Sequence, residues 1–159
     1  RFKAKPEGLV DRITNLQSDL KTTQKSLDAL KSELALLKSD QLLGQAETMG
    51  EFQVIVANMA AVDADSLKTA AERLLQKLGD GAVVLGSIPA EGKVSLVAAF
   101  SQPVIGKGLK AGQFIGGIAK LTGGGGGGRP NFAQAGGRDA SKLPEALEAA
   151  KEQLRSVLG

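Results

Sequence analysis

The sequence predicts an α+β protein, in which a long N-terminal coiled-coil helix precedes a small α/β domain with a mixed sheet and a glycine-rich loop. Three observations lead to this fold class. Apolar residues first recur with a strict 4-3 spacing, then alternate as they do in strands, and later give way to a run of six glycines, Gly123 to Gly128. We expect two domains, a helical coiled-coil arm over 1–48 and a globular domain over 51–159.

The first segment has the heptad pattern of a coiled coil, sustained over about four repeats. Such an apolar seam is too large to leave exposed to water, so we expect it to bury against another helix. That helix comes either from a second copy or from sequence outside this chain. Thr23 interrupts the seam, and it either helps to select the register or is a tolerated defect. The residues assigned to dimerisation are Leu9, Ile13, Leu16, Leu20, Leu27, Leu30, Leu34 and Leu37.

From Glu51 the period of the apolar residues changes. Phe52, Val54 and Val56 alternate as in a half-buried strand. The segment from Asp63 to Leu78 then has one apolar face, which predicts a helix that Asp63 or Asp65 begins and Gly79 ends.

The rest of the chain supplies the remaining elements of the predicted mixed sheet and its helices. Two strands are expected to pair through the turn Pro-Ala-Glu-Gly, and the last helix is expected to open on Ser141 and to carry Pro144 in its first turn. The expected ranges are strands at Ala82–Ile88 and Lys93–Ser101 and helices at Lys110–Leu121 and Leu143–Leu158.

Composition excludes several classes of protein. The chain has 159 residues and no apolar run close to the ~20 residues that a membrane helix needs. No signal peptide is visible, so we expect a soluble cytoplasmic protein. The chain begins with Arg1 in a segment that already reads as helix, and we expect it to be a piece of a longer protein.

The absence of cysteine and histidine bears directly on chemistry. It removes disulfides, thiolate nucleophiles, imidazole ligands and histidine-based catalysis. A metal site built from carboxylates alone is formally possible, but the acidic residues are scattered along the predicted helices. We therefore expect no catalytic residue, no metal and no cofactor in this chain.

Positive charge is concentrated in the middle of the chain. From Ala82 to Arg138 there are six basic residues and one acid, whereas the rest of the sequence holds 14 basic and 16 acidic residues. The basic part surrounds the glycine run. Such a segment is typical of a protein that binds a polyanion, although six charges can also form a solvated face.

The glycine run has two possible meanings. Its backbone amides can form an anion-binding nest, to which Arg129 and Arg138 would add donors suited to phosphate. The alternative is tight packing of an irregular loop over the sheet. The run is not a P-loop, because no Gly-Lys-Ser/Thr follows, and it comes after a predicted helix instead of a first strand, which argues against a dinucleotide fingerprint.

The segment GLKAGQFIGGIAKLTGGGGGGRPNFAQAGGRDASKLPEALEAA closely resembles the DHH-associated C-terminal domain of alanyl-tRNA synthetases. The family pattern is a Lys-Ala-Gly helix, a glycine turn ending in Arg-Pro, Ala-Gln-x-Gly-Gly and a last helix. Gly125 stands where many relatives have Lys or Ser, and Asn131 where Asp is common. The matching residues are Lys110, Ala111, Gly112, Gly123, Gly124, Gly126, Gly127, Gly128, Arg129, Pro130, Ala133, Gln134, Gly136 and Gly137.

This resemblance implies a tRNA-binding domain that contacts the outer corner of the tRNA and helps to present alanine-accepting tRNA to aminoacylation and editing sites elsewhere in the parent chain. ATP and zinc would then belong to that parent, an alanine-tRNA ligase. Two alternatives are a nucleotide-binding accessory domain of an Asp-His-His phosphoesterase and a purely structural dimerisation module. The residues expected to contact tRNA are Lys107, Lys110, Lys120, Gly126, Gly127, Gly128, Arg129, Gln134 and Arg138.

Overall fold

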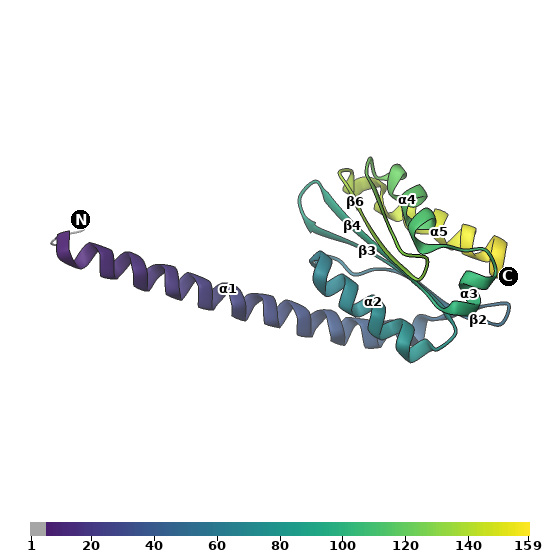
Figure 1. Ribbon diagram of the computed structural model, residues 1–159, viewed down its shortest axis with the longest axis horizontal. Coiled ribbons are helices and arrows are strands. Elements are labelled where there is room, and N and C mark those ends of the chain that lie inside the picture. The colour runs from purple at the N-terminus through teal and green to yellow at the C-terminus, as the bar shows by residue number, and fades with distance from the viewer. Residues whose placement is uncertain (1–5) are drawn as a thin grey trace. The chain divides into compact units, whose positions relative to one another are not determined.

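The computed structural model describes residues 6–159, and side chains from Gly8 onward, so the first five residues of the expected arm lie outside it. The chain forms two compact units, which we call the first and the second unit. The boundary between them falls between Leu34 and Ala35. The elements, labelled as in Figure 1, are α1 (Pro6–Leu42), η1 (Leu43–Gln45), β1 (Glu47–Met49), β2 (Phe52–Asn58), α2 (Ala64–Leu78), β3 (Gly81–Ala90), β4 (Lys93–Phe100), α3 (Gln102–Gly106), α4 (Ala111–Leu121), β5 (Gly125–Gly128), β6 (Phe132–Gly137), η2 (Ala140–Lys142) and α5 (Leu143–Leu158).

The predicted α+β class is confirmed, with a long N-terminal helix followed by a mixed sheet. The six strands lie in the order β1-β2-β3-β4-β6-β5. Strands β2 and β3 are parallel and joined through α2, whereas every other neighbouring pair is antiparallel. Parallel neighbours need a crossover of about a dozen residues or more, which α2 provides.

Helices cover the sheet on both faces (Figure 1). On one face, α4 and α5 pack over residues such as Val84, Leu96 and Phe100. On the other face, α2 and the end of α1 pack over Val83, Leu85 and other buried side chains. Successive side chains along β3 and β4 point to opposite faces of the sheet, so they are buried alternately in the core under α4 and α5 and in the core under α2.

Several local predictions are confirmed. The Asp63 carboxylate accepts a hydrogen bond from the Ser66 amide at 2.9 Å and begins α2, while Gly79, with φ 77°, ends that helix. Helix α5 has the predicted bounds Leu143–Leu158. The predicted start of this helix at Ser141 differs from the structure. Ser141 lies in the short turn η2 before α5, and the Asp139 carboxylate caps that turn by accepting a hydrogen bond from the Ser141 amide.

Elements that the sequence analysis missed are short or rich in glycine. Strand β1 pairs with β2 at one edge of the sheet, and helix α3 follows β4. At the other edge the last four glycines of the run, Gly125–Gly128, form strand β5, and the segment after them forms β6. The expected glycine-rich loop is therefore corrected to a β-hairpin, which adds two strands to the sheet.

Candidate functional site

The β5–β6 hairpin is fixed at both ends by backbone hydrogen bonds. At its turn the Arg129 amide donates to the Phe132 carbonyl at 2.8 Å. At its open end the amides of Arg138 and Asp139 both donate to the Thr122 carbonyl, at 2.8 and 3.0 Å. These bonds hold the two arginines at opposite ends of one ladder, with the glycines between them.

Glycines along β5 alternate between two environments. A methyl group at Gly128 would lie 2.6 Å from the Phe132 carbonyl oxygen and 2.7 Å from the Ala133 Cα, which is too close for a real side chain. Methyl groups at Gly124 and Gly126 would also collide with the β6 backbone, whereas at Gly125 and Gly127 a methyl group would meet nothing within 4 Å. Packing therefore requires glycine at alternate positions only.

Helix α4 packs directly against β5 through its own glycines. A methyl group at Gly112 would lie 2.7 Å from the Gly128 carbonyl oxygen, and one at Gly116 would lie 3.1 Å from that of Gly126. The Gly124 amide also donates to the Ala119 carbonyl at 3.0 Å. The close approach of helix and strand explains why small residues recur in this helix.

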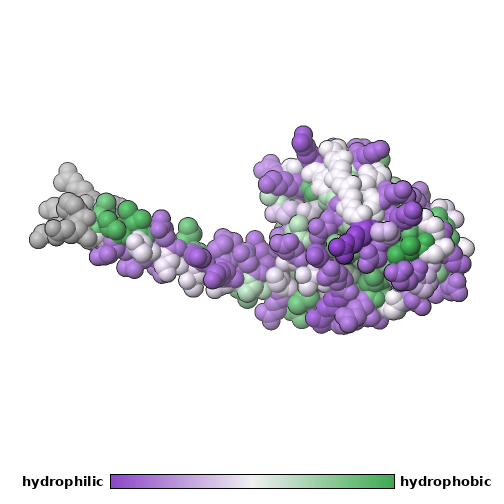
Figure 2. Space-filling view, viewed as in Figure 1, coloured by the Kyte–Doolittle hydropathy of each residue, from purple (hydrophilic) through white to green (hydrophobic). Residues whose placement is uncertain are grey.

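The opposite face of the hairpin is open. By register, Gly125 lies beside Gly136 and Gly127 beside Gln134, while β4 continues the same face with Ser95 next to Gly136. We call these five residues the glycine-floored face. Figure 2 shows it as a pale strip with hydrophilic residues around it. A partner could approach the main chain here without meeting bulky side chains.

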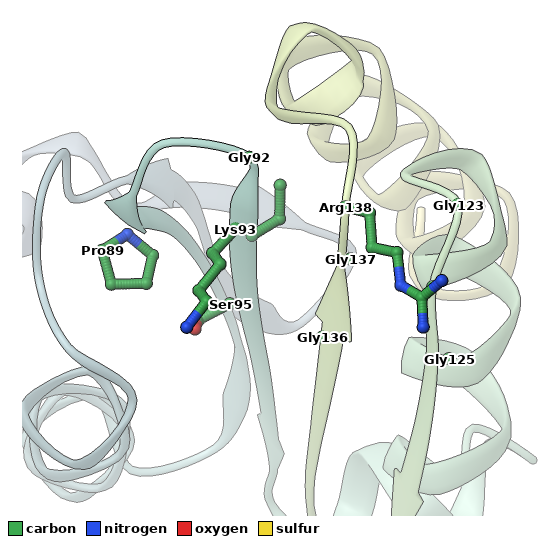
Figure 3. Close-up of a pocket in the computed structure, with 11 residues that line it drawn as sticks. Pro89, Gly92, Lys93, Ser95, Gly123, Gly125, Gly136, Gly137 and Arg138 are labelled. Carbon is green, nitrogen blue, oxygen red and sulfur yellow. The ribbon is translucent and has the colours of Figure 1, made fainter.

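A hollow lies at each end of the glycine-floored face. One, of about 780 Å³, is lined by Lys93, Gly125 and Arg138 among other residues. Figure 3 shows the Arg138 side chain reaching across to β5 near Gly125, while Lys93 lies beside Ser95. The other hollow, of about 440 Å³, is lined by Lys68, Arg129 and one acid, Glu72.

Several unpaired cations of the second unit line the two hollows of this face. Within residues 35–159, the basic side chains that form no ion pair are Lys38, Lys68, Lys93, Lys110, Lys120, Arg129 and Arg138. Four of the seven line the two hollows, and two more, Lys110 and Lys120, lie at the ends of α4. Unpaired charge at one place favours an anionic partner.

Comparison with known proteins places this arrangement in a family. The model of the DHHA1 domain matches residues 51–156, from the start of β2 almost to the end of α5. The chain belongs to the DHHA1 domain family.

Similar proteins agree with this assignment. Alanine–tRNA ligases of Trichodesmium erythraeum and Synechocystis are 74% and 69% identical over 97% and 100% of this chain, which spans only 18% of their length. The crystal structure of the C-Ala domain from Aquifex aeolicus alanyl-tRNA synthetase is 31% identical, with a TM-score of 0.63, over 69% of this chain and 97% of that one. The resemblance stated from the sequence is thus confirmed.

The DHHA1 fold distributes the predicted contact residues unevenly. Gln134 and the two arginines lie on the hairpin, with Arg129 and Arg138 at its opposite ends, and Lys110 and Lys120 lie at the ends of the helix that packs against it. Lys107 lies elsewhere: its ammonium group is 3.4 Å from Glu51 and lies 5.8 Å from the centroid of the Phe52 ring. Gly126 and Gly128 belong to the packed positions of β5, and Gly127 to the open ones.

Sequence reasoning missed Lys68 and Lys93 as site residues. Lys68 comes from α2, and its ammonium group lies 5.7 Å from the centroid of the Phe132 ring, at the turn end of the hairpin. Only the packing of α2 on the sheet brings it there. Lys93 could have been found, since it begins a predicted strand inside the basic segment.

The heptad seam of α1 lies exposed. Its eight apolar side chains, seven in the first unit and Leu37 in the second, are between 44% and 70% exposed, and Figure 2 shows hydrophobic groups at the helix surface. In the second unit a different face of the same helix is buried, through Ala35, Ser39 and Leu42. The helix thus has one buried face near its end and an exposed apolar seam.

Two acidic residues form ion pairs between elements of the second unit. Asp40 bonds to Lys77 at 2.6 Å and to Arg73 at 3.1 Å, and Glu47 contacts Lys151 and Arg155. The hydrogen bond from Lys77 lowers the pKa of Asp40, and that from Lys151 lowers the pKa of Glu47.

Within the described residues, no three acidic side chains gather in a way that could hold a metal ion. No described helix has the length and apolar character to cross a membrane.

Proposed function

We propose that this chain is the C-terminal region of an alanine-tRNA ligase, that it binds tRNA across the glycine-floored face, and that it self-associates through the α1 seam. Relatives that are alanine–tRNA ligases, at 65–74% identity over nearly the whole chain, support the parent activity over that of an Asp-His-His phosphoesterase. The observation that carries tRNA binding is the group of four unpaired cations, Lys68, Lys93, Arg129 and Arg138, that line the hollows at the two ends of an open stretch of backbone. The domain would not catalyse a reaction but would help present the tRNA to the aminoacylation and editing sites of the parent.

The two ends of the face are suited to phosphate groups. Arg129 and Arg138 each present a planar fork of donors, which matches phosphate oxygens better than a lysine ammonium does. The floor between them lets a sugar-phosphate backbone approach the main chain. The chain has no Tyr or Trp and only five Phe, so little aromatic surface is available for stacking unpaired bases. Recognition would rest on shape and charge.

A titration with alanine-accepting tRNA at several salt concentrations tests this proposal. If three or four cations contact phosphates, the slope of log affinity against log salt should be roughly −2 to −3.5. Arg129→Ala or Arg138→Ala should each weaken binding by about 1 kcal/mol, or about fivefold, as a partly exposed charged hydrogen bond is lost.

Arg155→Ala is the matched control for these variants. It removes the same charge beside Glu47 of β1, at the edge of the sheet away from β5. We expect it to leave affinity unchanged, and Lys107→Ala to have a smaller effect than either hairpin arginine, because Lys107 is already paired with Glu51. Unchanged affinity and salt slope in the Arg129→Ala/Arg138→Ala double variant would overturn the proposal.

Self-association is tested separately by sedimentation. The seam from Leu9 to Leu37 forms a stripe of about 40 Å at ~1.5 Å per residue. We expect a dimer at micromolar concentration, and Leu20→Glu should weaken it without unfolding the second unit, because that side chain is 70% exposed in the single chain. A monomer throughout that range would contradict self-association.

A further inference from the structure

The exposed seam of α1 also contains information on how two copies would pair. Its 4-3 spacing assigns Ile13, Leu20, Leu27 and Leu34 to heptad position a, and the others to position d. Residues at e and g then flank the seam. Charged residues at these positions set the orientation and register of a coiled coil.

We propose that α1 pairs with α1 of a second copy of this chain in antiparallel orientation, in one register. This inference rests on the proposed self-association. In that register each residue at position a packs against a residue at position d of the second copy, and the two helices run in opposite directions from one layer to the next. The layers are Leu9 with Leu34, Ile13 with Leu30, Leu16 with Leu27, and Leu20 with Thr23, each formed twice.

The charges that flank this seam are complementary. Antiparallel helices bring g positions opposite g positions, and here Arg12 lies opposite Glu33 of the second copy, twice per dimer. The other g pair is Asp19 with Ser26, which places no like charges together. At the e positions, Val10 faces the aliphatic stem of Lys31, and Gln17 faces Gln24.

Shifting the antiparallel register by one heptad in either direction loses this complementarity. One shift brings Asp19 opposite Glu33 of the second copy, and the other brings Asp19 opposite its own counterpart. Like charges at facing positions are destabilising. Among these three antiparallel registers, only the unshifted one therefore combines an attractive pair with the absence of a repulsive one.

A parallel dimer fits less well. Its g and e positions would pair Glu33 with Lys38 as their only opposite charges, and it would place Thr23 against Thr23. Lys38 is half-buried and lies in the second unit, where the helix already packs through Ala35 and Ser39. The antiparallel layers, by contrast, end at Leu34, which is also the last residue of the first unit.

Cysteine cross-linking tests the orientation without background, because the chain contains no cysteine. Leu9→Cys and Leu34→Cys chains of different tag length are mixed, equilibrated and oxidised. The antiparallel register predicts the mixed disulfide as the main product, since a bond needs Cα atoms within about 7 Å. Predominant Leu9→Cys or Leu34→Cys homodimers would refute the orientation.

Charge exchange tests the register independently. Arg12→Glu or Glu33→Arg should each raise the dimer dissociation constant about tenfold, because attraction becomes repulsion at two sites. The double variant Arg12→Glu/Glu33→Arg should return it to the original value. Restoration by Glu33→Arg/Lys38→Glu instead would establish the parallel arrangement. A wild-type chain that stays monomeric in sedimentation would overturn self-association itself, whereas a dimer with the wrong cross-links would overturn only its orientation.

Discussion

Gly127→Ala and Gly128→Ala form a matched pair that separates packing from surface function. The two glycines are neighbours on β5, and the substitution is the same. At Gly128 the added methyl group would lie 2.6 Å from a backbone oxygen and 2.7 Å from a backbone Cα, neither of which can rotate away. At Gly127 it would meet nothing within 4 Å, and this glycine does not have the positive φ that disfavours alanine.

The structure gives the size of each effect. Overpacking against backbone costs roughly 1–3 kcal/mol, and for a chain of this length each kcal/mol lowers Tm by about 2–4 °C, so Gly128→Ala should lower Tm by roughly 2–12 °C. Gly127→Ala should leave Tm unchanged or slightly higher, because alanine restricts the unfolded chain. Its methyl group nevertheless stands on the glycine-floored face, so tRNA should bind more weakly, and Gly127→Val more weakly still.

Thermal unfolding followed by circular dichroism measures the first effect, and tRNA titration of the folded variants measures the second. An equal fall in Tm for Gly127→Ala and Gly128→Ala would show that Gly127 is also needed for packing. A Gly127→Val chain that is folded and binds tRNA normally would show that no partner approaches the backbone there.

Further predictions concern the rest of the second unit. Asp40 and Glu47 have lowered pKa values, so the stability they provide is present above their ordinary values of 3.8 and 4.5 and is lost as pH falls through the lowered ones. Asp40→Asn should therefore flatten the decline of Tm below about pH 4, and an unchanged decline would contradict a role for that carboxylate. Leu74→Ala should lower the free energy of unfolding by about 2–5 kcal/mol in urea titration, because this side chain is fully buried between α2 and the sheet, whereas Leu16→Ala should barely alter it.

Much of the fold could be predicted because local signals agreed with tertiary packing. In α2 the amphipathic pattern, the Asp63 cap and the Gly79 terminus all indicate the same helix. The docking of the end of α1 could not be predicted, because Ala35 and Ser39 are small residues that also suit a solvent-exposed face. Lys68 escaped notice for a different reason, since its place beside Phe132 depends on how α2 packs on the sheet.

The glycine run shows why sequence alone left two interpretations open. A strand reveals its two faces through alternating side-chain chemistry, and six identical residues without side chains carry no alternation. Once β5 is placed between β6 and α4, the two interpretations apply to different residues. Gly124, Gly126 and Gly128 are required because a methyl group would strike the β6 backbone, whereas Gly125 and Gly127 lie on the open face. Packing therefore accounts for half of the run, and the positive φ of Gly123, 64°, accounts for a fourth glycine. Gly125 and Gly127 keep clear the surface between Arg129 and Arg138 on which a nucleic-acid backbone could lie.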